Sequence, residues 1–192
     1  EETVKHIGDA FIESLKEIIY HCVKPGTKHF TPSDFPLATL SQSFLDSISD
    51  PSSIETIYSL SPLQEGLLFH ALASPDSDQY CTQTCWNYEG DLNINALEEA
   101  WYNIFSSHPI FRTAFVWEEG DVPFQIVYRE VSLPWHIKDL SKVEREKQEE
   151  EIEEVRKKIR REGFNLSKPP LAYLHLFILG RNEYRFIWTC HH

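Results

Sequence analysis

Apolar residues recur along the chain with two periods, one typical of helices and one typical of strands. Spacing of three and four positions predicts helices over residues 4–22, 40–48, 62–74, 94–107 and 142–162. Runs rich in aromatic, threonine and β-branched residues predict strands over residues 80–88, 111–118, 124–129, 171–179 and 184–190. The chain is therefore expected to form a mixed α and β domain, without internal repeats.

The last two predicted strands carry the clearest packing signal. Residues 171–179 and 184–190 flank a turn at 180–183 and are apolar on both faces. A sheet with two apolar faces needs a covering layer on each side. We therefore expect this sheet to be covered on both sides.

The first and last predicted helices differ in polarity. The first has one apolar stripe, which must pack against another surface, and its members are Val4, Ile7, Phe11, Leu15, Ile18 and Cys22. Residues 142–162 instead have a wide polar face rich in Glu and Lys, which indicates a solvated surface with ion pairs.

Composition excludes several function classes. The chain has 192 residues, 41% of them hydrophobic, which is enough for one substantial core. Its formal net charge of −12 argues against binding to nucleic acid, because such proteins need clustered Lys and Arg. No segment resembles a signal peptide or a membrane span, so we expect a soluble, cytoplasmic protein without a membrane partner.

The cysteines indicate a reducing compartment, and the lack of methionine indicates a fragment. Without a secretory signal, the four cysteines are expected to be reduced, packed thiols. The chain contains no methionine, even at position 1, which suggests that it is a piece of a longer protein.

Two adjacent histidines are the main candidates for chemistry. They follow the last predicted strand, and the two-residue period of a strand directs His191 and His192 to opposite faces. One can then be held inside by hydrogen bonds, while the other projects into a cleft as a general base. The dipeptide alone also fits two polar residues that simply end a strand.

Metal binding and hydrolysis find little support. No C-x-x-C pair or helical H-x-x-x-H is present, and Cys81 and Cys85 would lie about 13 Å apart on a strand, too far to share a metal ion. No G-x-S-x-G turn presents a nucleophile. We therefore predict no metal site.

Four segments, in order and spacing, resemble motifs of the condensation domains of nonribosomal peptide synthetases. They read SPLQEGLLFH at 61–70, HPIFRTAF at 108–115, GFNLSKPPL at 163–171 and FIWTCHH at 186–192. The last resembles the lead into the family's HHxxxDG motif. The resemblance covers residues 54–192, the N-terminal lobe of such a domain, truncated at the two histidines.

The preceding residues resemble a junction between synthetase domains. The segment IIYHC at 18–22, followed by TPSDFPL at 31–37, is similar to the junction between an upstream epimerization domain and a condensation domain. Residues 1–30 are therefore expected to be a helix and linker from that junction, and residues 31–53 a linker with a short helix. Together with the SPLQEG form of the first motif, this junction suggests the subclass that accepts a D-configured donor residue.

The resemblance implies an α/β fold of the α+β type, the N-terminal lobe of a chloramphenicol-acetyltransferase-like fold with a mixed sheet and covering helices. Family members transfer an upstream carrier-bound peptidyl or acyl thioester to the amine of a downstream carrier-bound aminoacyl thioester. Phosphopantetheine belongs to the carriers, so this domain is expected to bind no cofactor of its own. The implied partners are both peptidyl carrier proteins, the second lobe and an adenylation domain, and the fragment alone is expected to be inactive.

The resemblance also assigns roles to individual residues. His192 corresponds to the catalytic histidine and His191 to the structural one, while Arg112 is expected to form a buried salt bridge that fixes the histidine segment. Ser61 and Gln64 match the first motif and are expected to line the tunnel, although a capped helix start explains both equally well.

Two other functions remain open. The lobe could be a noncatalytic module that docks carrier proteins or neighbouring domains. It could also belong to an epimerization domain, which shares the fold and the histidine motif but inverts an α-carbon.

Overall fold

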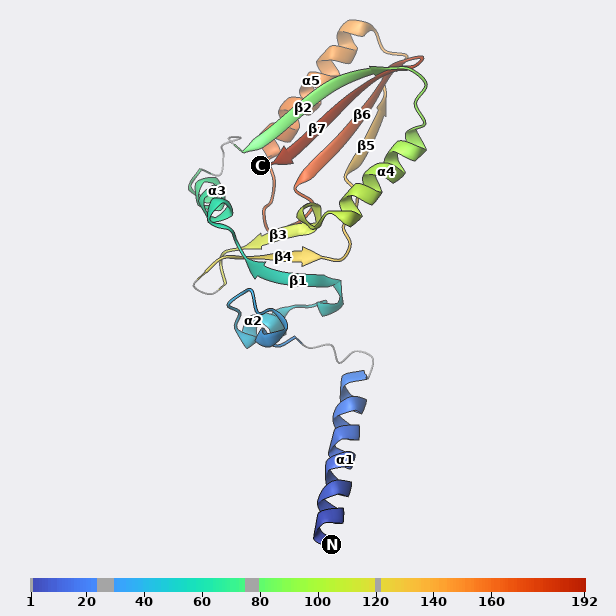
Figure 1. Ribbon diagram of the computed structural model, residues 1–192. Coiled ribbons are helices and arrows are strands. Elements are labelled where there is room, and N and C mark those ends of the chain that lie inside the picture. The colour runs from blue at the N-terminus through green and yellow to red at the C-terminus, as the bar shows by residue number, and fades with distance from the viewer. Residues whose placement is uncertain (1, 24–29, 75–79, 120–121) are drawn as a thin grey trace.

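The computed structural model describes residues 2–23, 30–74, 80–119 and 122–192 (Figure 1). In chain order, its elements are α1 (Glu2–Val23), η1 (Pro32–Asp34), α2 (Gln42–Ser47), η2 (Pro51–Ser53), β1 (Ile54–Ser59), α3 (Pro62–Ala73), β2 (Cys81–Glu89), α4 (Ile94–Ser107), η3 (Pro109–Arg112), β3 (Thr113–Val116), β4 (Phe124–Tyr128), β5 (Trp135–Asp139), α5 (Arg145–Glu162), β6 (Ala172–Gly180) and β7 (Glu183–His191).

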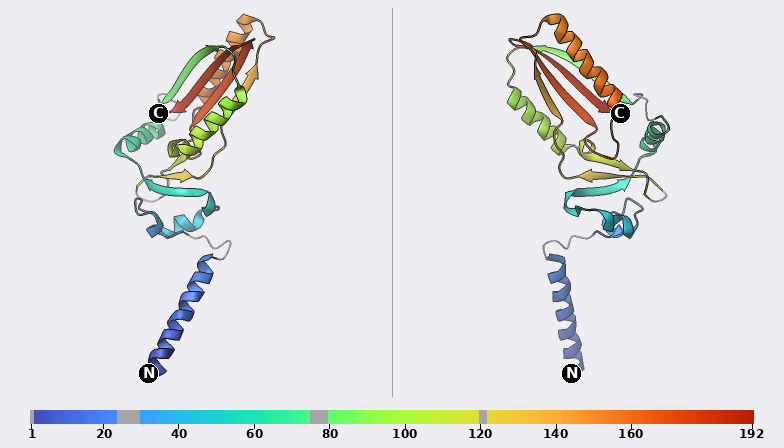
Figure 2. Two further views of the ribbon diagram at one scale, coloured as in Figure 1. Left: turned by 45° about the vertical axis from the view of Figure 1, so that its right-hand side comes forward. Right: turned by 180° about the vertical axis from the view of Figure 1, so that it is seen from behind.

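The larger sheet, sheet B, has the strand order β2-β7-β6-β5. It is mixed, because β5 runs parallel to β6 whereas the other neighbours are antiparallel. α4 and α5 lie on its opposite faces (Figures 1 and 2). Trp188 of β7 packs against Trp101 and Phe105 of α4, while its neighbour Ile187 packs with Ile152 of α5. The expectation that both faces are covered is confirmed, and helices provide the cover.

The smaller sheet, sheet A, is antiparallel and has the strand order β1-β4-β3. The segment that precedes it in the chain packs against it, because Phe35 and Leu45 share a buried cluster with Ile57 and Phe124. The predicted short helix is present as α2 and begins after the N-cap residue Ser41. Residues 30–48 therefore pack as a layer against sheet A.

α3 lies at the junction between the two sheets. Its Leu68 packs with Leu60, which follows β1, and with Leu166, which precedes β6. The backbone N–H of Phe115 in β3 donates a hydrogen bond to the carbonyl of Leu166 at 2.8 Å. The junction therefore fixes the end of sheet A beside the segment that leads into sheet B.

The start of α3 confirms the predicted cap. The Ser61 hydroxyl accepts from the backbone N–H of Gln64 at 3.3 Å, and the Gln64 side-chain oxygen accepts from the N–H of Ser61 at 2.9 Å. Pro62 occupies the first helical position, where its missing N–H costs no hydrogen bond. Reciprocal bonds of this kind satisfy two of the donors that a helix start leaves unpaired.

α1 forms as predicted, but it has no buried residue. Its stripe residues Val4, Phe11 and Ile18 are 73%, 68% and 60% exposed. In Figure 1 the helix extends away from the two sheets. Within the described part of the chain, the prediction that this stripe packs against another surface is wrong.

The cysteines are reduced, as expected, but they are not all packed. No disulfide joins the four thiols, all of which lie in described residues. Cys22 and Cys85 are exposed, so the expectation of packed thiols is wrong for these two. Cys85 is exposed because β2 is an edge strand of sheet B and is open to solvent over most of its length.

Two strands were not predicted from the sequence, namely β1 and β5. β1 completes sheet A, and β5 adds the only parallel pairing found among the described residues. None of the described helices is long and apolar enough to cross a membrane.

Candidate functional site

The two histidines lie where β7 ends, between two neighbouring segments. The N–H of His191 donates to the carbonyl of Leu171 at 3.0 Å, and the N–H of His192 donates to the carbonyl of Tyr80 at 2.8 Å. His191 also faces Cys81 of β2 in the strand register. Both backbones are thus held from two sides, which limits the directions that the imidazole rings can take.

Two residues before His191, the buried polar side chain of Thr189 connects β7 with β2. Thr189 is fully buried, and its hydroxyl accepts a hydrogen bond from the Gln83 amide at 3.0 Å. The Gln83 oxygen in turn accepts from the Arg156 guanidinium of α5 at 3.0 Å. Because every member has a partner, this network fixes the end of β7 relative to α5.

His191 is the inner member of the pair. Its half-buried ring lies 6.2 Å from the Tyr80 ring and 6.4 Å, edge to face, from the Phe164 ring. Its Nδ1–H donates to the carbonyl of His192 at 3.1 Å. Burial lowers the pKa of His191, and the nearby His192 adds to that effect, while the hydrogen bond to the carbonyl opposes it. His191 is therefore held as a neutral hydrogen-bond donor at neutral pH.

His192, in contrast, is exposed. It lies with Gln64 and Leu67 of α3, Phe115 of β3 and Leu166 around a small hollow of about 20 Å³. Such a hollow has room for about one water molecule. The two histidines thus differ in exposure as the strand period predicts, His191 being half-buried and His192 exposed, although both border this hollow.

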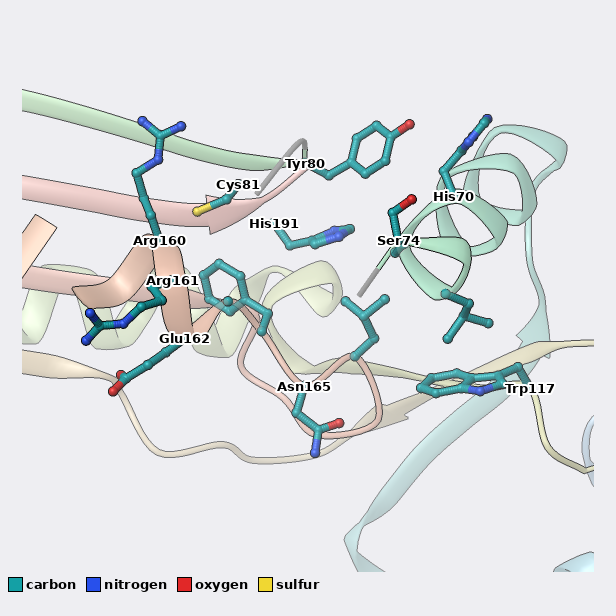
Figure 3. Close-up of a pocket in the computed structure, with 15 residues that line it drawn as sticks. His70, Ser74, Tyr80, Cys81, Trp117, Arg160, Arg161, Glu162, Asn165 and His191 are labelled. Carbon is teal, nitrogen blue, oxygen red and sulfur yellow. The ribbon is translucent and has the colours of Figure 1, made fainter. Parts of the chain in front are cut away.

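A larger pocket of about 270 Å³ lies on the His191 side. Figure 3 shows the His191 ring near its centre, close to Tyr80 and Ser74, with Trp117 on the opposite side. The guanidinium groups of Arg160 and Arg161 point away from the ring. The walls near the histidine are therefore aromatic and neutral, which suits an uncharged group better than an anion.

Arg112 is buried in an ion pair, as expected. Its guanidinium donates to a Glu55 carboxylate oxygen at 2.5 Å, to the carbonyl of Tyr128 and, at 3.4 Å, to the carbonyl of Arg129. These contacts join η3 to β1 and to the end of β4 rather than to the histidines. Its Nε is buried without a hydrogen-bond partner in the described structure. Support of the histidine segment by Arg112 stays a prediction.

Ser61 and Gln64 occupy different places relative to the histidines. Both form the cap of α3, but of the two only Gln64 also lines the hollow beside His192. Gln64 pairs with Gln125 of β4, a residue that is 2% exposed and was not singled out in the sequence. The one sequence signal for Gln125 was its place as a polar residue inside an otherwise apolar strand.

The described residues hold no group of three or more side chains arranged to bind a metal ion. His136 of β5 and His175 of β6 stack with their ring centroids 4.6 Å apart. Two imidazoles alone do not make the four-ligand set that zinc requires.

Comparison with known proteins places this geometry in a family. The sequence profile of the family described as "Condensation domain" matches residues 54–192. The chain belongs to the condensation-domain family. The match covers β1 to the two histidines, the same residues 54–192 over which the family resemblance was predicted.

The similar curated proteins are much longer than this chain. It is 37% identical over 193 residues to one of the proteins that make up the linear gramicidin synthase of Brevibacillus parabrevis, covering 100% of this chain and 4% of that protein. It is 32% identical over 194 residues to bacitracin synthase 3 of Bacillus licheniformis, covering 100% of this chain and 3% of that protein.

Solved structures confirm the fold. The starter condensation domain of rhizomide synthetase matches with a TM-score of 0.63 and 20% identity, over 72% of this chain and 34% of that one. The first condensation domain of the calcium-dependent antibiotic synthetase matches with a TM-score of 0.60 and 21% identity, over 71% and 33%. The predicted chloramphenicol-acetyltransferase-like lobe is therefore correct, and this chain spans about a third of those domains.

Proposed function

We propose that this chain is the N-terminal lobe of a condensation domain that forms an amide bond between two carrier-bound substrates. The observation that carries the proposal is the exposed His192 imidazole, held by backbone hydrogen bonds at the end of a buried strand. The family supplies the reaction class, and the chain corresponds to only 4% of the linear gramicidin synthase protein that it matches, as one part of a long synthetase would.

In the proposed reaction, the amine nitrogen of the downstream aminoacyl group attacks the carbonyl carbon of the upstream thioester. The new C–N bond forms, the C–S bond breaks, and the proton lost by the amine ends on the leaving thiolate. His192 can accept that proton and return it, or it can orient the amine and stabilise charge in the tetrahedral intermediate. Both thioesters are carried by the phosphopantetheine arms of the carrier proteins.

His191 and Arg112 serve the site indirectly in this proposal. His191 donates its Nδ1–H to the carbonyl of His192, which restrains the backbone that carries the reacting imidazole. Arg112 ties η3 to sheet A and keeps one buried N–H donor available at Nε. A buried guanidinium N–H pairs well with a carboxylate, so an acidic side chain from the segment after His192 would give the Arg112 Nε its hydrogen-bond partner.

The other wall of the tunnel would come from polypeptide that follows His192. α3 is apolar on most sides, yet Leu68 is its only buried residue among those described, and Leu63 and Phe69 are 70% and 67% exposed. A helix that is apolar all round is normally covered on all sides. The C-terminal end of β7 lies close to α3 (Figure 1), so the following segment leaves the sheet beside this surface.

The N-terminal part supports a position inside a longer synthetase. The family match begins at residue 54, whereas the alignment with the linear gramicidin synthase protein covers the whole chain, α1 included. We assign residues 1–30 to the end of a preceding domain and 31–53 to the connecting layer. A preceding epimerization domain and a D-configured donor residue are the finer form of this proposal.

The decisive experiment uses the complete synthetase module with both carriers loaded. His192→Ala is expected to lower amide formation by at least about a hundredfold, the scale of losing a general acid-base group. His6→Ala, on the exposed face of α1, is the matched control and is expected to leave the rate unchanged. Equal product formation in His192→Ala and the wild type would reject the assignment.

The same assay separates the alternatives. If the domain epimerizes instead, the α-carbon of the upstream residue inverts when no downstream amine is present. If it only docks carriers, His192→Ala leaves carrier binding and product formation alike unchanged. Supplying the upstream thioester in D and L forms tests the donor preference.

A further inference from the structure

Gln125 is a buried polar residue on the face of β4 that looks toward α3. Its side chain is 2% exposed, and it pairs in register with Phe115 of β3. Phe115 lines the hollow that contains His192. A buried amide in this place needs hydrogen-bond partners for both its N–H and its C=O groups.

Those partners come mainly from Gln64, 61 residues earlier in the chain. The Gln64 Nε2 donates to the Gln125 Oε1 at 3.2 Å, and the Gln125 Nε2 donates back to the Gln64 Oε1 at 3.1 Å. The Gln125 Nε2 also donates to the carbonyl of Ser59 at 3.1 Å. The two amides thus form a closed pair that links α3 to sheet A.

The pair matters because α3 is otherwise weakly held. Leu68 is the only α3 residue buried in the described structure, and it packs at the junction of the sheets. The half-buried Ala71, one turn further along α3, packs into the same cluster. Apolar contacts on one side of a helix are not directional, so they fix its rotation about its axis only loosely. The amide pair is directional, so it fixes which side of α3 faces His192.

We propose that Gln125 is a positioning residue for the histidine site. It acts through Gln64: the pair holds the first turn of α3 so that Gln64 and Leu67 form one wall of the groove at His192. This inference rests on the proposed amide-forming function for its effect on catalysis, but its structural part can be tested without any activity.

An amide is needed at position 125 because Gln64 offers both a donor and an acceptor, while the Ser59 carbonyl offers a second acceptor. Gln125→Glu keeps the size but replaces the donor with an oxygen, which then faces the Gln64 Oε1 and the Ser59 carbonyl. Acceptors in contact repel, and burial raises the pKa of an introduced carboxyl group. When that carboxyl takes up a proton, it donates again and the pair re-forms.

Hydrogen exchange of the α3 amides tests the placement directly. At pH 7.5, Gln125→Glu is expected to raise exchange in residues 62–73 at least about tenfold over the wild type, because a local opening of that helix becomes easier. At pH 6, the exchange rate of these amides in the variant, divided by that in the wild type, should fall back toward one. Gln42→Glu, on the exposed face of α2, is the control, and its α3 exchange rate should stay near that of the wild type at both pH values.

Turnover by the complete module tests the catalytic consequence. Gln125→Glu is expected to lower kcat about tenfold at pH 7.5 with little change in KM, and to recover as the pH falls, because misplacement of a site wall slows the reaction more than it weakens binding. Gln64→Leu, Gln125→Leu and the double variant should lose similar activity, since removing either amide breaks the same pair.

The outcomes separate this inference from the proposed function. If His192→Ala has no effect but α3 exchange changes as described, the reaction assignment fails and the placement of α3 by Gln125 stands. If α3 exchange in Gln125→Glu equals the wild type at pH 7.5, the inference is overturned. Lower thermal stability with normal kcat at every pH also overturns it. Should Gln125→Glu not fold, Gln64→Glu places the same conflict on the more exposed partner and is read in the same way.

Discussion

Gln148 gives the sharpest test of how α5 is held on sheet B. It is 4% exposed, and its Nε2 donates to three backbone carbonyls, those of Leu140 at 2.8 Å, Val143 at 3.1 Å and Leu179 at 2.9 Å. One side-chain amide thereby joins the end of β5, the start of α5 and the end of β6. Its replacement should weaken all these connections together.

The loss of stability expected from replacing Gln148 can be worked out from these contacts. In Gln148→Leu the Leu140 carbonyl keeps its hydrogen bond from the Val143 N–H at 2.9 Å, so the cost falls mainly on the other two carbonyls. At about 1–1.5 kcal/mol for each buried bond, the free energy of unfolding should fall by roughly 2–3 kcal/mol at most, because the variant also removes the Gln148 Oε1, which is buried without a hydrogen-bond partner in the described structure. For a chain of this size, that corresponds to a decrease in Tm of roughly 4–12 °C.

Gln148→Glu should cost more at neutral pH, because its carboxylate faces carbonyl oxygens that only accept. The loss should diminish as the pH falls, since the protonated carboxyl donates again. Urea and thermal unfolding followed by circular dichroism measure both variants. Glu150→Gln, on the exposed side of α5, is the control and should stay within about 0.5 kcal/mol of the wild type. A Gln148→Leu variant as stable as the wild type would refute this reasoning.

The remaining predictions concern titration and thiol reactivity. Burial, with a smaller contribution from the neighbouring His136, lowers the pKa of His175 from 6.5 to about 4. The unfolded chain therefore takes up a proton below pH 6.5 that the folded chain refuses until about pH 4, so stability falls as the pH decreases through this window. Allowing for the partial exposure of the ring, we expect a loss of about 1–2 kcal/mol between pH 7 and pH 5 in urea unfolding, and a smaller one in His175→Phe; an equal loss in both proteins would contradict the assignment. Burial raises the pKa of the Cys190 thiol, whereas Cys85 is exposed. A maleimide at pH 7 should therefore modify Cys85 well before Cys190, and mass spectrometry of the digested protein would show the reverse order if this is wrong.

The helices were predictable because their periodicity is local. The predicted bounds 94–107 coincide with those of α4, and the cap at Ser61 with Gln64 is present as the motif indicates. β5 was missed because its five residues, WHIKD, carry three polar side chains and lie at a sheet edge. Its parallel partner β6 comes after the whole of α5, and no local pattern specifies such a pairing.

The candidate site was predictable where it depends on a strand period. Alternation along β7 separates His191 from His192, and the structure has one half-buried and the other exposed. Gln125 was missed because it is a single polar residue in an apolar strand, and Gln148 because it lies among the charged residues of α5, which were expected to form a solvated face. Each also depends on a group far away in the sequence: Gln125 bonds with Gln64, 61 residues away, and Gln148 with Leu179, 31 residues away, and only the folded chain brings these groups near.

The position of β7 within sheet B has a consequence for biosynthesis. β7 is the last strand in the chain, yet it lies in the interior of the sheet, with β2 on one side and β6 on the other. During translation, β2 leaves the ribosome about a hundred residues before its partner and must remain unpaired until then, whereas β1, β3 and β4 can already join. Sheet A is thus expected to fold on the nascent chain first, and the edge of β2 is the segment that chaperones must protect in the meantime.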